Sequence, residues 1–147
     1  MRPHPDVVPL FANAKAVERA FFLETGIFPI MHLVAMRRDC YERNPWIASS
    51  LYQAFVAAKN RALTQLHRRG AHPYMLPWVE HAVREIDEVF GGDPWPYGID
   101  ANRPTLEALV QYMAEQSLIA RRVPIESLFV PCREDTPQNS RAKEVHA

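Results

Sequence analysis

Residues 25–54, TGIFPIMHLVAMRRDCYERNPWIASSLYQA, decide the fold, because they join the clearest strand pattern in the chain to its longest helical pattern. Apolar residues occupy both faces of an extended chain over 30–36, as in a strand that is buried on both sides. Pro29 lacks an N–H group, so the strand is expected to begin at or just after it. His32 is the one polar residue of this strand.

The residues after the strand predict a turn and then a long amphipathic helix. Residues 37–39, Arg-Arg-Asp, return the chain to solvent, and Asn44-Pro45 is typical of an N-cap followed by proline at the first helical position. Gly70 is expected to end the helix, after basic residues whose positive charge interacts favourably with the negative end of the helix dipole. Its apolar positions recur at helical spacing: Ile47, Leu51, Ala54, Phe55, Ala58, Ala62 and Leu66.

Three further helices are expected. The first runs from an Asn13 cap to about Glu24, with a buried side made of Val17, Ala20 and Phe21. The second is opened by Pro77 and ended by Gly91-Gly92, and its apolar stripe is Trp78, Val79, Ala82, Val83, Ile86, Val89 and Phe90. The third starts at about residue 102 with Pro104 in its first turn, and its buried face is Leu106, Leu109, Val110, Met113 and Leu118. A short final turn is expected over 124–129.

Length and charge restrict the class of protein. A chain of 147 residues with 48% hydrophobic residues is typical of one globular domain, expected over 13–131 between an extended lead-in, 1–12, and a disordered tail, 132–147. Formal net charge is zero, which predicts no general attraction to nucleic acid or to an anionic membrane. No run of about 18 apolar residues and no secretory pattern is present, so a cytoplasmic location is expected.

Metal and cofactor sites are not expected either. Cys40 and Cys132 have neither a metal-binding spacing nor the pattern of a disulfide framework. The six histidines form no HExxH motif, and no glycine-rich phosphate loop is present.

The predicted elements are unbalanced, because four substantial helices accompany a single convincing strand. The pattern favours an α-rich α/β fold, yet a strand that is apolar on both faces needs neighbours for its backbone donors and acceptors. Three explanations remain open: the chain dimerises across this strand, a partner supplies the other strands, or the chain is a piece of a larger α/β protein.

Two segments of the chain are informative together: GIFPIMHLVAMRRDCYERNPWIASSLYQAF, residues 26–55, and WPYGIDANRPTLEALVQYMAEQSLIARRVPIESLFVP, residues 95–131. Both resemble the C-terminal part of the 4,5-dihydroxyphthalate decarboxylase family. The resemblance extends from about Ala16 to Pro131, whereas members of the family are considerably longer. It implies part of a two-lobed fold like that of type II periplasmic binding proteins, with four main helices and one or two strands. It also implies that an aromatic diacid loses carbon dioxide to give protocatechuate, without an organic cofactor.

Decarboxylation of a dihydroxylated aromatic diacid needs a general acid and a cationic anchor for the carboxylate that stays. His32 is the candidate for the acid or for a substrate hydrogen bond, since histidine titrates near neutral pH, and the plain alternative is a buried histidine bonded to backbone. Arg37 and Arg38 are candidate carboxylate anchors, although such a pair is also typical of a solvated turn. Tyr97 is a candidate for lining the cleft, or else it packs with Trp95 as a rigid connector.

Three classes of function are therefore considered. The first is a decarboxylase, or its C-terminal portion, acting on a small aromatic dicarboxylate and completed by a missing N-terminal half. The second is a solute-binding module of a transport system, because fold alone does not separate binding from chemistry. The third is a noncatalytic remnant or an interaction protein that forms a homo-oligomer over its strand edge. We expect the isolated chain to lack decarboxylase activity and to expose apolar surface.

Overall fold

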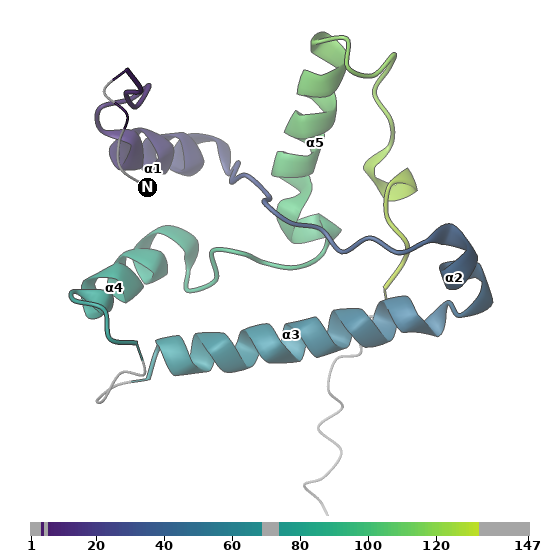
Figure 1. Cartoon of the computed structure of the whole chain (residues 1–147), viewed down its shortest axis with the longest axis horizontal. Helices are drawn as coiled ribbons and strands as arrows, with labels where there is room; N and C mark the ends of the chain where they lie inside the picture. Colours follow the sequence, from purple (N-terminus) through teal and green to yellow (C-terminus); the bar gives the residue numbers. More distant parts are fainter. Residues whose placement is uncertain (1–3, 5, 69–73, 133–147) are drawn as a thin grey trace, which may run out of the picture. The chain divides into compact units, whose positions relative to one another are not determined.

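The computed structural model describes residue 4 and residues 6–68 and 74–132 of the chain. Within these residues it contains five α-helices and one short 3-10 helix (Figure 1). The chain divides into two compact units. One unit is Met1–Leu33 with Pro73–Leu128, and the second is Val34–His72 with Phe129–Ala147.

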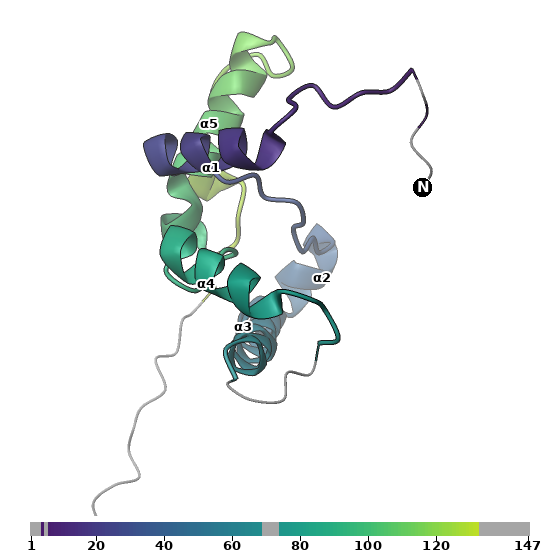
Figure 2. The same ribbon diagram turned by 90° about the vertical axis from the view of Figure 1, so that its left-hand side faces the viewer.

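The first unit contains helices α1 (Ala14–Thr25), α4 (Val79–Phe90) and α5 (Ile99–Glu115), with the 3-10 helix η1 (Ile125–Ser127). The glycine stop predicted for α4 is confirmed, and α1 ends in the same way, because Gly91 and Gly26 have φ values of 65° and 67° and lie in the left-handed region. Lys15 of α1 forms an ion pair with Glu85 of α4, and Figure 2 shows the two helices as neighbours.

An aromatic cluster joins three parts of this unit. The ring centroid of Phe22 in α1 lies 4.6 Å from that of Phe90 at the end of α4 and 5.9 Å from that of Phe28. The ring centroids of Phe28 and Phe90 are 5.0 Å apart. Tilted and edge-on rings at such separations stabilise one another beyond the apolar area that they bury. The predicted buried side of α1 is wrong, because Val17 and Phe21 are 42% and 43% exposed and Ala20 is exposed as well, while Phe22 provides the packing.

Helix α5 and η1 enclose the small core of the first unit. Leu106, Val110 and Ile125 are buried there, and Arg103 of α5 bonds the Glu126 carboxylate at 2.9 Å. The predicted start at residue 102 is wrong, since α5 begins at Ile99 and includes Pro104 in its interior. The predicted buried face is confirmed for Leu106 and Val110 but is wrong for Leu109, which is 54% exposed, and for Leu118, which lies beyond the end of the helix and is exposed.

The Thr105 hydroxyl fixes the chain that follows α1 onto α5. Its Oγ1 accepts a hydrogen bond from the Phe28 N–H at 3.1 Å and donates one to the Phe28 carbonyl at 3.2 Å. One hydroxyl thus satisfies both backbone groups of Phe28, much as a neighbouring strand would. This contact fixes the point at which the expected strand would start.

The second unit contains α2 (Arg38–Arg43) and α3 (Trp46–Leu66). The turn predicted at residues 37–39 is instead the beginning of α2, and the Asn44 amide donates to the Cys40 carbonyl rather than capping α3. The long helix itself is confirmed. It ends at Leu66, where the His67 ring bonds the Leu63 carbonyl at 2.8 Å, and the predicted stop at Gly70 lies outside the described residues.

The apolar stripe predicted for α3 is not covered by its own unit. Leu51 and Phe55 are 38% and 45% exposed, and only Ala48 of this helix is buried. Removing apolar side chains of this size from water lowers the free energy of the protein. The face of α3 that carries them is therefore available for further packing.

The predicted strand is not formed among the described residues, which include no β-strand at all. Residues 26–36 have neither helical nor strand structure, and residues 29–35 are exposed. A strand exists only where a second extended chain bonds to it, and none lies beside this segment in the described part of the chain. The α-rich character is confirmed, whereas the sheet of an α/β fold and the two-lobed architecture stay predictions.

The predicted domain limits lie largely beyond what the structure describes. Residues 133–147 of the expected tail are outside the described residues, as is part of the expected lead-in. The described part of the lead-in has no regular secondary structure before Ala14, and Leu10 in it is 90% exposed. The extent of the 13–131 domain stays a prediction.

Replacing Thr105 by valine is expected to loosen the segment that begins at Phe28, because valine keeps the shape but removes both hydrogen bonds. Loss of about 1–2 kcal/mol of local stability makes exchange of the Phe28 amide hydrogen roughly 5- to 30-fold faster. Hydrogen exchange followed by NMR measures this rate. Thr105→Ser retains the hydroxyl and serves as the control; equally fast exchange in both variants would show that the hydroxyl does not hold Phe28.

Candidate functional site

His32 lies in the irregular segment between α1 and α2, and its side chain is exposed. The segment keeps an extended course for local reasons: Gly26 ends α1, and Pro29 disfavours helix at the residue before it. No hydrogen bond or ion pair of the His32 ring is present among the described residues. The alternative of a buried histidine bonded to backbone is therefore not what this structure contains.

Arg37 is already engaged by a carboxylate. Its Nε donates a hydrogen bond to Asp39 Oδ1 at 2.9 Å and its Nη2 donates one to Asp39 Oδ2, so the guanidinium already forms a bidentate pair with a carboxylate. Arg43 adds a second cation to the same carboxylate, with its Nη2 at 3.0 Å from Oδ2. The hydrogen bond from Arg37 is the main reason that the pKa of Asp39 lies below its usual value. A substrate carboxylate at Arg37 would have to displace Asp39.

Arg38 differs from Arg37 in its surroundings. It is the first residue of α2 and is exposed, and in the described part of the chain it forms no ion pair or hydrogen bond through its guanidinium. Its fork is therefore open to an external carboxylate, which the planar guanidinium can bind through two parallel hydrogen bonds. Of the two predicted anchors, Arg38 is the one whose binding groups are not already used.

Tyr97 belongs to the loop between α4 and α5 in the first unit. Asn102 holds this loop, because its side-chain amide donates to the carbonyls of Pro96 at 2.7 Å and Gly98 at 2.9 Å. Tyr97 and Trp95 are 39% and 55% exposed, so neither residue is buried as a packed connector between helices would require. Hydrogen bonds from Asn102 therefore hold the backbone of this loop, while its aromatic side chains are exposed.

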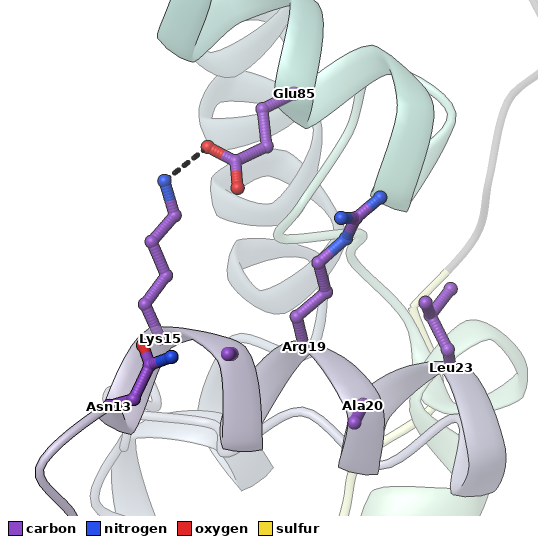
Figure 3. A pocket seen from close by; sticks show the side chains of 7 residues that line it. Asn13, Lys15, Arg19, Ala20, Leu23 and Glu85 are labelled. Carbon is purple, nitrogen blue, oxygen red and sulfur yellow. Dashed lines mark hydrogen bonds and ion pairs between the residues drawn. The ribbon is translucent and has the colours of Figure 1, made fainter.

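A pocket of about 580 Å³ lies within the first unit between α1 and α4 (Figure 3). Its apolar wall comes from Ala16, Ala20 and Leu23, and Arg19 extends from α1 toward α4 with no ion pair of its own among the described residues. None of the four predicted site residues lines this pocket. The sequence reasoning passed over Arg19, because an arginine on the polar face of a helix is usually a solvated side chain.

The four predicted residues are thus divided between the two units. His32 and Tyr97 belong to the first, whereas Arg37 and Arg38 belong to the second. No group of three or more histidine, cysteine, aspartate or glutamate side chains in the described ranges is placed to hold a metal ion. No helix among the described residues is long and apolar enough to cross a membrane.

No protein-family model matches the chain. The chain is 31% identical over 130 residues to a 4,5-dihydroxyphthalate decarboxylase from Comamonas testosteroni. The match includes 88% of this chain but 39% of the relative, so the chain spans about two fifths of the length of the curated relative that it matches. The resemblance inferred from the two sequence segments is confirmed by this match.

Replacing Arg37 by alanine is expected to raise the pKa of Asp39 toward its ordinary value, because the largest contribution to the lowered pKa is removed. Since the folded pKa is the lower one, the stabilisation by this pair is present above the unfolded pKa of about 3.9 and is lost as the pH falls through the folded value. NMR titration of the Asp39 carboxyl carbon measures the shift. Arg38→Ala is the matched control and should leave the titration unchanged; an unchanged titration in Arg37→Ala would contradict the pairing.

Proposed function

This chain is a homologue of 4,5-dihydroxyphthalate decarboxylase over 130 of its residues, and we propose that it acts as one portion of a decarboxylase for aromatic dicarboxylates. The observation that carries the proposal is the identity of 31% across 88% of the chain. The chain spans 39% of that relative, so the proposal assigns to it a share of the substrate site and not the whole of it. Substrates held between two lobes contact residues from both.

The reaction adds a proton to the ring carbon that bears the departing carboxylate. The carbon–carbon bond to that carboxylate then breaks, its electron pair restores the aromatic ring, and carbon dioxide leaves. A positioned general acid typically accelerates such a step by about 10²–10⁴-fold. We assign this role, or a hydrogen bond to the substrate, to His32, whose exposed ring is free to donate its proton and to recover one from solvent.

The carboxylate that remains on the ring requires a cation. Arg38 is the proposed anchor, because its guanidinium has no partner among the described residues and a bidentate pair with a carboxylate is both strong and directional. Arg37 is a second anchor in this proposal, reached only after Asp39 is displaced from it. Tyr97 contributes an aromatic wall from a loop that Asn102 braces.

The proposal predicts no release of carbon dioxide from 4,5-dihydroxyphthalate by the 147-residue chain alone. It predicts turnover when the chain is fused behind the remainder of the Comamonas testosteroni decarboxylase, the part that the 130-residue match leaves out. In this fusion His32→Asn should lower kcat by about 10²-fold or more. His81→Asn is the matched control, because His81 is an exposed histidine of α4 outside the proposed site, and it should leave kcat unchanged.

Each contrary outcome has a distinct meaning. Turnover by the isolated chain would contradict the assignment of only part of the site to it. A fusion that binds 4,5-dihydroxyphthalate without turnover would favour a solute-binding module, since the same architecture serves both functions. A fusion that neither binds nor turns over this compound would favour a noncatalytic interaction protein. Equal kcat in His32→Asn and in the unaltered fusion would remove His32 from the mechanism.

A further inference from the structure

The segment of residues 29–36 has no hydrogen bond from its backbone to any other described residue. Its apolar side chains are also uncovered, since Met31, Leu33 and Val34 are 72%, 67% and 68% exposed. Met31 and Leu33 lie on one side of an extended chain and Val34 lies on the opposite side, so both faces are apolar. Water can satisfy the backbone groups, but it cannot offset the exposure of the apolar side chains.

Both ends of this segment are held, in contrast to its middle. At one end the Thr105 hydroxyl binds the N–H and the carbonyl of Phe28. At the opposite end the Arg37 carbonyl accepts hydrogen bonds from the N–H groups of Cys40 and Tyr41, each at 3.1 Å, in the first turn of α2. The unbonded stretch is therefore bounded by two local structures that the chain forms by itself.

We propose that Ile30–Met36 is a strand for an interior position in a β-sheet, and that the polypeptide corresponding to the uncovered part of the Comamonas relative supplies this sheet. A strand that is apolar on both faces and has free backbone groups along both edges is suited to a position between two neighbours. The chain matches only 39% of that relative, so the remaining part is long enough to provide neighbouring strands. The inference does not depend on which reaction the complete protein catalyses.

A second copy of this chain is less suited than that polypeptide to pair with residues 30–36. Two copies related by a two-fold axis would pair Ile30–Met36 with itself, because such an interface uses the same patch on both subunits. The product would be an isolated two-stranded ribbon, which is marginal in water, and each strand would keep one unpaired edge. A partner that already contains a sheet satisfies both edges and covers both faces.

Hydrogen exchange of the amides of residues 31–36 tests the proposal. The exchange is measured in the chain alone and in the fusion with the remainder of the Comamonas decarboxylase. We expect near-unprotected rates in the chain alone and rates slowed by about 100-fold or more in the fusion. Leu33→Pro removes one backbone donor from the strand and should abolish most of this protection. Val8→Pro alters an equally irregular and exposed position outside the segment, and should retain it.

Three results would overturn the proposal. The first is equal exchange rates in the chain alone and in the fusion. The second is protection that appears in the chain alone and grows with its concentration, which would identify a second copy as the partner. The third is full protection in the Leu33→Pro fusion. Because exchange is read without turnover, a fusion that protects this segment but is inactive would uphold the inference while contradicting the proposed function.

Discussion

The backbone of residues 30–36 has no hydrogen-bond partner among the described residues, and this limits what the chain can fold into by itself. Ordering a residue costs about 1–2 kcal/mol in backbone entropy, and a strand recovers this only through ladder hydrogen bonds and covered side chains. The described chain offers this segment neither, and the segment remains irregular and exposed. The boundary between the two compact units, at Leu33 and Val34, falls inside it.

The proposed site depends on the same segment. His32 lies within it, and Arg37 and Arg38 follow directly, so three of the four proposed residues would be positioned by whatever orders this strand. Preorganised placement of an acid and a carboxylate anchor is what makes such groups effective in catalysis. The exposed ring of His32 and the unengaged guanidinium of Arg38 are therefore consistent with a site whose geometry is completed only in a longer protein.

The four longer helices of the described residues were predictable because their signals are local, whereas the short α2 lies where a turn was expected. Left-handed glycines end α1 and α4, and apolar spacing over three or more turns fixes the existence of α3 and α5. The choice between Phe21 and Phe22 as the packing residue was not predictable, since it depends on where Phe90 lies. An Asn-Pro pair is typical of an N-cap, but Asn44 instead ends the preceding helix. The strand pattern at residues 30–36 is local, whereas a strand also needs neighbouring strands, for which the sequence of this segment carries no signal. For the site, the sequence could nominate residue types, whereas the pairing of Arg37 with Asp39 and the pocket beside Arg19 depend on tertiary placement.

A crystal structure of the fusion with bound 4,5-dihydroxyphthalate would show both the sheet and the substrate. We predict strands hydrogen-bonded along both edges of residues 30–36, and the imidazole of His32 within hydrogen-bond distance of the substrate. The same segment without strand neighbours, with the substrate bound away from His32, would contradict this prediction.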